Sequence, residues 1–276
     1  MLKRHEGAQG EKQSSRVAGI LRVRFARAGG ATQLADLHET GGVRLKLPRG
    51  AHCEAVMVNV GGGLAGGDRL NVALALDAGA QATFTTQSAE KIYRADGAQT
   101  IVKAQVTLAA EADLIWAPQE TLLFDGARLR RHLNVEMAAT ATLTLVESAV
   151  FGRLAHGEHD ADSHVRDSWR IRRGGALLIA EEAAVRGAAA LDRPALGGGA
   201  RATATLIIIG KRAGPALEPL RALLEARADE GVEAGVSLIE DRLFARALAR
   251  DPARLRSALR EAIIASTGRA LPRVWN

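Results

Sequence analysis

The sequence predicts a mainly β fold: a body of stacked β-strands, arranged like a β-helix, followed by a small C-terminal α+β part that contains two helices. From about residue 17 to 209, hydrophobic residues alternate with polar or small ones, which is the period of a β-strand. Glycine-bearing turns separate these strand patterns, and a weak repeat runs through them. Helical spacing of leucines begins only after residue 210.

A repeat of about thirty residues underlies the body. The copies are "LDAGAQATF" (76–84), "LAAEADLIW" (108–116), "MAATATLTL" (137–145) and, more loosely, "IRRGGALLI" (171–179). Each copy has the pattern of a strand, a tight turn and a second strand. Such copies are expected to stack as β layers that bury a common hydrophobic face.

Polar residues follow each copy at the same place, ten or eleven positions after its start. They are Gln87, Gln119, Glu147 with Ser148, and Glu181 with Glu182. If the copies stack, these side chains form a polar column through the structure.

The chain divides into four expected segments. They are a flexible N-terminus (1–16), the β-repeat body (17–191), a glycine-rich loop (192–202) and the C-terminal α+β part packed on the body (203–276). In the last segment, a buried strand at 205–210 precedes a first helix and two further strands. Asp251 caps the final helix, Pro252 is its first residue, and Gly268 ends it.

The composition is that of a soluble, cytoplasmic protein. Cys53 is the only cysteine, so no disulfide can form within the chain, and a reducing compartment is expected. The N-terminus lacks the hydrophobic run of a secretory signal, and no segment approaches the ~20 apolar residues that span a bilayer. The net charge is +6, but basic residues alternate with hydrophobic ones, as in "LRVRF" (21–25). This pattern favours the solvated face of a strand over a nucleic-acid-binding patch.

The stretch "GGGLAGGDRL" (61–70) matches the G-x-G-x-x-G spacing of a dinucleotide loop, beginning at Gly61. A phosphate-binding loop requires a helix directly after its glycines, whereas the following "DRLNVALAL" (68–76) alternates as a strand. The glycines are therefore interpreted as a tight loop between strands. This interpretation does not account for Asp68, at the mouth of the loop.

Other candidate chemistry is weak. The polar run at 156–164 holds donors suited to Ni²⁺, Zn²⁺ or Cu²⁺, although a run this polar is more often a solvated loop. These donors are His156, Glu158, His159, Asp160, Asp162 and His164. Cys53 and His52 are neighbours on a predicted strand and point to opposite faces, so Cys53 is expected to be a small core residue. No G-x-S-x-G, H-E-x-x-H or C-x-x-C motif occurs, which indicates a protein that is not an enzyme.

Five blocks together carry a family resemblance. They are "NVGGGLAGGDRL" (59–70), "TTQSAEKIYRADG" (85–97), "APQETLLFDGARLRR" (117–131), "ESAVFGRLAHGE" (147–158) and "LPRVW" (271–275). In order, spacing and identity they resemble the urease accessory protein D family, UreD, also called UreH, from about residue 20 to the C-terminus. Motif residues within the blocks are Gly66, Gly67, Tyr93, Arg94, Pro118, Glu120, Asp125, Gly126, Gly152, Arg153 and Glu158.

The resemblance implies a non-enzymatic scaffold made largely of stacked β-strands. Such a scaffold binds apo-urease, recruits the accessory protein F and, through it, the GTPase G, and helps pass Ni²⁺ to the urease active site. The resemblance further implies no tightly bound cofactor, only transient Ni²⁺, and allows a dimer formed through the accessory complex.

Three carboxylates are candidates for a transient nickel route on this resemblance. Asp68 matches the family's Gly-Gly-Asp, Glu90 lies in the "AEKIYR" block, and Glu181 stands where a carboxylate follows the "LL" strand. Many members carry His-Pro-Pro before the double glycine. Here Asn59 occupies the histidine position, so a metal role for that histidine is not carried over.

A route suits delivery better than a tight site does, because a Cys/His cage would hold Ni²⁺ too firmly. Sparse carboxylates and amides, such as Asp68 and the polar column, exchange a metal more readily. Ordinary buried hydrogen bonding in a β stack explains the same residues equally well. Two other functions stay open from the sequence: a nucleotide-binding enzyme that uses the Gly61–Gly67 loop, and a basic nucleic-acid-binding module.

Overall fold

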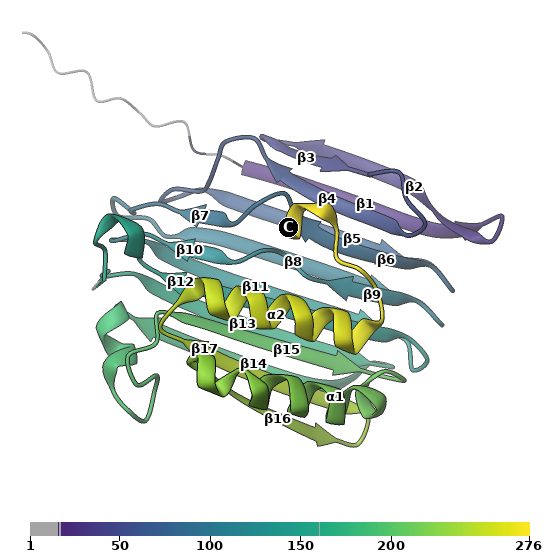
Figure 1. Cartoon of the computed structure of the whole chain (residues 1–276). Coiled ribbons are helices and arrows are strands. Elements are labelled where there is room, and N and C mark those ends of the chain that lie inside the picture. The colour runs from purple at the N-terminus through teal and green to yellow at the C-terminus, as the bar shows by residue number, and fades with distance from the viewer. Residues whose placement is uncertain (1–15, 17, 160) are drawn as a thin grey trace, which may run out of the picture.

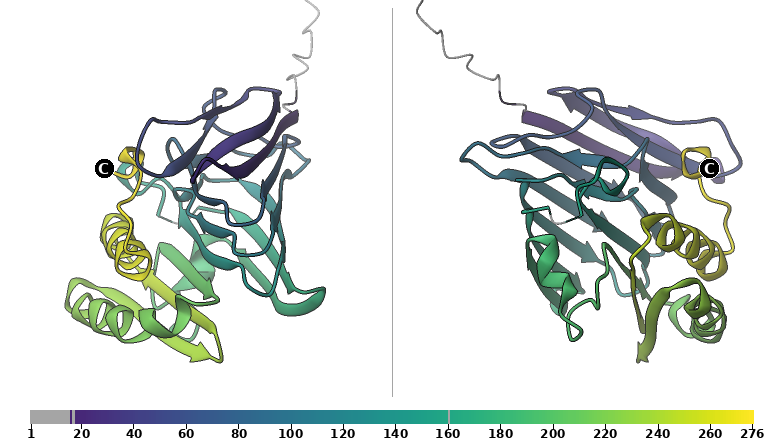
Figure 2. Two further views of the ribbon diagram at one scale, coloured as in Figure 1. Left: turned by 90° about the vertical axis from the view of Figure 1, so that its right-hand side faces the viewer. Right: turned by 60° about the vertical axis from the view of Figure 1, so that its left-hand side comes forward.

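The computed structural model describes residue 16 and residues 18–159 and 161–276, so the N-terminus predicted to be flexible lies outside the described residues apart from Arg16. Two sheets pack face to face (Figures 1 and 2). Sheet A has the strand order β14 (Ala176–Arg186), β13 (His164–Arg173), β11 (Arg128–Met137), β8 (Thr100–Leu108), β5 (Arg69–Leu76), β1 (Ala18–Ala28) and β2 (Ala31–Thr40).

Sheet B lies opposite sheet A and is the larger of the two. Its order is β16 (Val232–Ile239), β17 (Arg242–Ala249), β15 (Ala202–Ile209), β12 (Thr142–Phe151), β9 (Asp113–Trp116), β6 (Gln81–Thr86), β4 (Cys53–Asn59) and β3 (Val43–Lys46). The short strand β10 (Thr121–Leu123) pairs with both β12 and β7 (Glu90–Ile92). The helices are α1 (Ala213–Ala226) and α2 (Pro252–Thr267), with 3-10 turns η1 (Leu154–His156), η2 (Ala188–Asp192), η3 (Ala228–Glu230) and η4 (Arg273–Trp275).

The predicted mainly β fold with stacked strands and two late helices is confirmed. In the first three repeat copies the chain leaves sheet A, turns tightly and enters sheet B, as β5–β6, β8–β9 and β11–β12. Successive copies pair in parallel and in register, for example Leu74 beside Val106 and Val106 beside Val135. Each copy thus forms one coil of a stack, with the hydrophobic positions pointing into the space between the sheets.

The fourth copy differs from the expected pattern. Its two strands, β13 and β14, form an antiparallel hairpin within sheet A and do not cross to sheet B. The turn is made by Gly174 and Gly175, whose φ angles are +58° and +83°. Two consecutive positive φ angles match a two-residue hairpin turn, which sends the chain straight back along its own strand.

A second hydrophobic core lies on the outer face of sheet B, between the strands β9, β12 and β15–β17 and the two helices, which cover this part of the face (Figure 1). This explains why β15 is buried on both faces at its end, from Leu206 to Ile209. The predicted ends of α2 are confirmed, since the Asp251 carboxylate accepts from the Ala253 N–H at 2.8 Å and Gly268 adopts a left-handed φ. The predicted loop 192–202 lies between η2 and β15 as a run of turns.

No helix in the described part of the chain is long and hydrophobic enough to cross a membrane.

Asp113 joins the helical layer to the β body. Its carboxylate lies 2.6 Å from Arg212, just before α1, and 3.0 Å from Arg269, just after α2.

We predict that Asp113→Ala lowers the free energy of unfolding by about 3–5 kcal/mol, because both guanidinium groups then stay buried without that partner. Chemical denaturation of the purified chain measures the change.

Asp77→Ala is the matched control, because it breaks an exposed ion pair with Arg24. Its expected effect is below about 1 kcal/mol. Equal effects of the two substitutions would contradict the role given to Asp113.

Candidate functional site

Three small cavities follow one another inside the β body. The loop cavity, about 60 Å³, lies between the glycine loop and the start of β7. The central cavity, also about 60 Å³, lies between the two sheets, and the far cavity, about 90 Å³, lies between them near β13 and β14. Glu90 lines the first two cavities, and Arg131 and Glu147 line the last two. The three cavities therefore form a row.

The residues of the predicted polar column fall along this row in repeat order. Gln87 lines the loop cavity, Gln119 the central cavity, Glu147 both the central and far cavities, and Glu181 the far cavity. Gln119 and Glu147 are buried, whereas Gln87 is exposed at one end of the row. At the other end, Glu181 is half-buried and bonds to Arg246 at 2.7 Å.

Glu90 stands between the loop cavity and the central cavity. Its carboxylate accepts a hydrogen bond of 2.9 Å from the Asn59 side-chain amide. The same amide donates to the Gly63 carbonyl at 3.1 Å, and its oxygen accepts from the Gly61 N–H at 3.0 Å. Asn59 thereby ties the glycine loop to Glu90. Burial raises the pKa of Glu90 to about 7, against an opposing effect of the Asn59 hydrogen bond.

A buried ionic cluster separates the central cavity from the far cavity. Arg131, which points inward from β11, forms ion pairs with Glu147 of β12 and Asp167 of β13. The Trp116 indole donates to Glu147 at 2.9 Å, and the Trp169 indole donates to Asp167 at 2.9 Å. Burial raises the pKa of Glu147, while Arg131 acts in the opposite direction. We call these five residues the Arg131 cluster.

The sequence analysis missed Arg131 and Asp167, although a signal for both was present. Arg131 occupies an inward position of its strand, between Leu129 and Leu133. Asp167 likewise falls between Val165 and Trp169, in phase with residues that face the interior. A charged residue in phase with core residues of an alternating strand indicates a buried ion pair.

Gln119 connects the row of cavities to the C-terminal block. Its amide donates to the Thr86 and Val274 carbonyls, both at 3.0 Å, and accepts from Arg256 of α2 at 2.8 Å. Arg256 also pairs with Glu120 and lies 5.0 Å from the centre of the Trp275 ring. The "LPRVW" ending thus closes over the residues that follow β9.

Asp68 lies outside the row, since it is not among the described residues that line the three cavities. It is 7% exposed, and its carboxylate accepts from the Ala65 N–H at 2.8 Å. A Cβ at Gly66 would lie 2.7 Å from the backbone of Ala95 and Ala98, so this glycine permits a close approach of two loops. The strand β5 follows directly, where a nucleotide loop would need a helix N-terminus.

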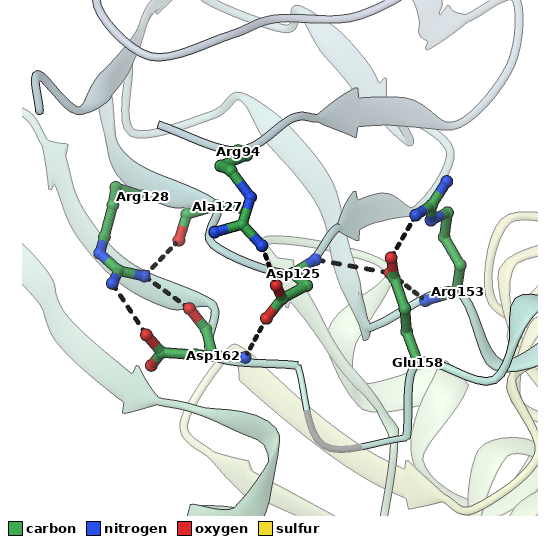
Figure 3. A network of polar contacts seen from close by, with 7 residues as sticks. All are labelled: Arg94, Asp125, Ala127, Arg128, Arg153, Glu158 and Asp162. Carbon is green, nitrogen blue, oxygen red and sulfur yellow. Dashed lines mark hydrogen bonds and ion pairs between the residues drawn. The ribbon is translucent and has the colours of Figure 1, made fainter. Parts of the chain in front are cut away.

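Most of the remaining motif residues bind neighbouring loops to one another (Figure 3). Arg94 pairs with Asp125, and Arg153 pairs with Glu158. The Asp125 carboxylate also accepts from the Asp162 N–H at 2.9 Å, and the Arg153 hydrogen bonds lower the pKa of Glu158 to about 2. This network holds the loops after β7, β10 and β12 together at one end of the stack.

The other motif positions serve the same region. Gly126 and Gly152 have φ angles of +74° and +86°, which suit glycine at these turns. The Tyr93 ring packs edge-on against Phe124, with 5.1 Å between ring centres. Pro118 lines the central cavity, and Gly67 adopts a φ of +91° in the glycine loop.

The described residues of the histidine-rich run and the surroundings of Cys53 show no gathered set of metal ligands. Among the described residues, no group of three or more His, Cys, Asp or Glu side chains gathers as a metal site. His164 lies 3.1 Å from Asp162, and Asp160 is outside the described residues. Cys53 is half-buried against the core, and burial raises the pKa of its thiol to about 11, so it is a poor nucleophile.

Glu90 gives a prediction about pH. An unfolded glutamate titrates near 4.5, whereas folded Glu90 has a pKa of about 7. The folded state therefore holds this proton more tightly, and ionisation of Glu90 opposes folding as the pH rises between these values. Relative to Glu90→Gln, the wild type should lose up to about 3 kcal/mol of unfolding free energy from pH 4.5 to 8.

Denaturant unfolding of both proteins across this pH range measures the difference. Gln keeps an oxygen that can accept the Asn59 hydrogen bond, so the two proteins should be nearly equally stable below pH 4.5. A difference that stays constant with pH would contradict the raised pKa.

Comparison with known proteins identifies the family. The sequence profile of the UreD urease accessory protein family matches residues 17–276. A urease accessory protein UreD of Methylobacterium sp. (strain 4-46) is 49% identical over 90% of this chain and 90% of its own length. UreD 1 of Methylobacterium radiotolerans is 43% identical (98% and 94%), and UreD of Beijerinckia indica is 45% identical (89% and 92%). The chain therefore belongs to the UreD family of urease accessory proteins.

Proposed function

We propose that the protein is a maturation scaffold that binds apo-urease together with the accessory proteins F and G and helps deliver nickel to the urease active site. Membership of the UreD family supports the maturation role. The row of cavities, each with a carboxylate or amide side chain in its lining, is the observation that supports a part in delivery. On this proposal the chain works in the cytoplasm without catalysis and without a tightly bound cofactor.

The proposed nickel route follows the row of cavities. It begins at Gln87 and Glu90, passes Gln119 and the Arg131 cluster, and ends near Glu181. These side chains offer oxygen ligands one or two at a time, and Ni²⁺ bound so weakly can be exchanged from one to the next. A dense cage of histidine and cysteine would instead retain the metal.

The Arg131 cluster limits how nickel could pass. When ionised, its two carboxylates outnumber its one guanidinium, so the cluster has a net negative charge that favours a cation. Glu147 lines the cavities on both sides of the cluster and is the carboxylate that a passing ion would meet. Arg131 holds this carboxylate in place and keeps its affinity for Ni²⁺ moderate.

The scaffold role is tested by a pull-down with the urease subunits and the accessory proteins F and G. We expect the tagged full chain to retain apo-urease and the F protein, and to retain G only when F is present. Failure to retain either apo-urease or F would contradict the proposal.

The route is tested by two substitutions of similar shape. We predict that Glu147→Gln keeps the pull-down complex but gives urease with several-fold less nickel and activity, because the carboxylate between two cavities is lost. Asp68→Asn should give nearly normal nickel content, since Asn can still accept the Ala65 N–H.

The measurement is the number of nickel ions per urease active site, determined by elemental mass spectrometry for urease matured with each variant. A Glu147→Gln protein that loads urease normally would remove Glu147 from the route. Reduced nickel with an intact complex in Asp68→Asn would bring Asp68 into it.

A further inference from the structure

The outer face of sheet A carries positive charge that the acidic side chains in the described part of the chain do not pair. Four neighbouring strands, β1, β5, β8 and β11, each present an outward cation of this kind. These cations are Arg22, Arg69, Lys103 and Arg130. Among the described residues, none of the four has an ion-pair partner, and all four are exposed.

Several other cations on the same face have carboxylate partners. Arg24 pairs with Asp77, Arg172 pairs with Glu136, and Arg166 and Arg170 share Glu182. The four cations named above lie in the middle of the sheet, from β1 to β11. At the spacing of adjacent strands, this region is about 15 Å wide.

His132 lies among the same cations. It lies directly beside Lys103 in the strand register, two residues from Arg130. Its pKa is lowered, first by burial and then by the charges of Arg130 and Lys103, against the opposing effects of Glu182 and Asp167. A second cation is thus disfavoured at this place, as expected where positive charge accumulates.

A groove of about 350 Å³ is lined by two of these cations, Arg22 and Lys103. Arg22, Ala73, Gln105 and Asn134 form one row across four strands. The small side chain of Ala73 leaves the hollow, and the amides of Gln105 and Asn134 supply N–H donors beside it. Both helices lie over the opposite sheet, so no helix in the described part of the chain covers this face (Figure 2).

We propose that this face docks an acidic surface of a partner protein in the maturation complex. The proposal rests on the proposed function for the existence of that complex, but not on the nickel route. Carboxylates of a protruding acidic loop match both the cations and the amide donors of the groove. Outward positions of these four strands carry no Phe, Tyr or Trp on which bases could stack, so a protein is favoured over a single-stranded nucleic acid.

The test uses the full chain assembled with apo-urease and the accessory proteins. A zero-length carbodiimide cross-linker joins a lysine amine only to a carboxylate in contact with it. We expect Lys103 to become linked to an Asp or Glu of a partner, as identified by mass spectrometry of the peptides. Lys103→Glu combined with Arg130→Glu should weaken binding of that partner by about tenfold or more at low salt, because like charges then face each other.

The matched control is Lys46→Glu combined with Arg221→Glu, which changes the net charge equally at exposed positions of β3 and α1. It should bind like the wild type. Two results together would overturn this proposal and leave the scaffold function standing. The complex would form without any cross-link at Lys103, and the reversed variant, Lys103→Glu with Arg130→Glu, would bind as well as the control. If the wild-type chain assembles with no partner, both proposals fail. A short DNA duplex that binds the wild type but not the reversed variant, without any Lys103 cross-link to protein, would replace the protein partner by nucleic acid.

Discussion

The in-register parallel stacking of the repeat copies is the constraint on which the rest of the structure depends. Because each copy begins its turn at the same phase, a given position in one coil lies beside the same position in the next, as Phe84 lies beside Trp116. Hydrophobic positions then build a continuous core, and the polar residues that follow the copies line the row of cavities. The outward positions align in the same way, which places cations from successive strands on one face.

Within the Arg131 cluster, each charged side chain lies beside an opposite charge. Arg131 has two carboxylate partners, and each carboxylate also accepts an indole N–H, from Trp116 or Trp169. Replacing the cluster with hydrophobic residues of similar volume would be expected to cost little or even to stabilise the fold. Stability alone therefore does not account for a buried ionic cluster between two cavities, whereas the proposed nickel route would give it a role.

Much of this arrangement could be predicted from the sequence. The repeat predicts stacked strands, and the alternation of hydrophobic and polar residues predicts which side chains point into the core. Residues ten or eleven positions after the start of each copy were selected in this way, and Gln87, Gln119, Glu147 and Glu181 among them line the row of cavities. Partners in neighbouring strands were not found, since Arg131 and Asp167 meet only through the β11–β13 register. Asp68 and Glu90 could not be told apart from the sequence, because both are carboxylates in family blocks. In the structure, Asp68 accepts a hydrogen bond from the Ala65 N–H of its own turn, whereas Glu90 lines the loop cavity.

The two sheets present different outer faces, and this difference bears on how a scaffold can work. The outer face of sheet B is hydrophobic where β15, β16 and β17 lie, and α1 and α2 of the same chain cover this part. The middle of sheet A presents polar and charged side chains to solvent, so contacts made there are weakened by salt and exchange readily. On the proposed function, the chain has to release its client once the metal is in place. A charged face that stays open to partners suits such binding, because the contacts can be both specific and reversible.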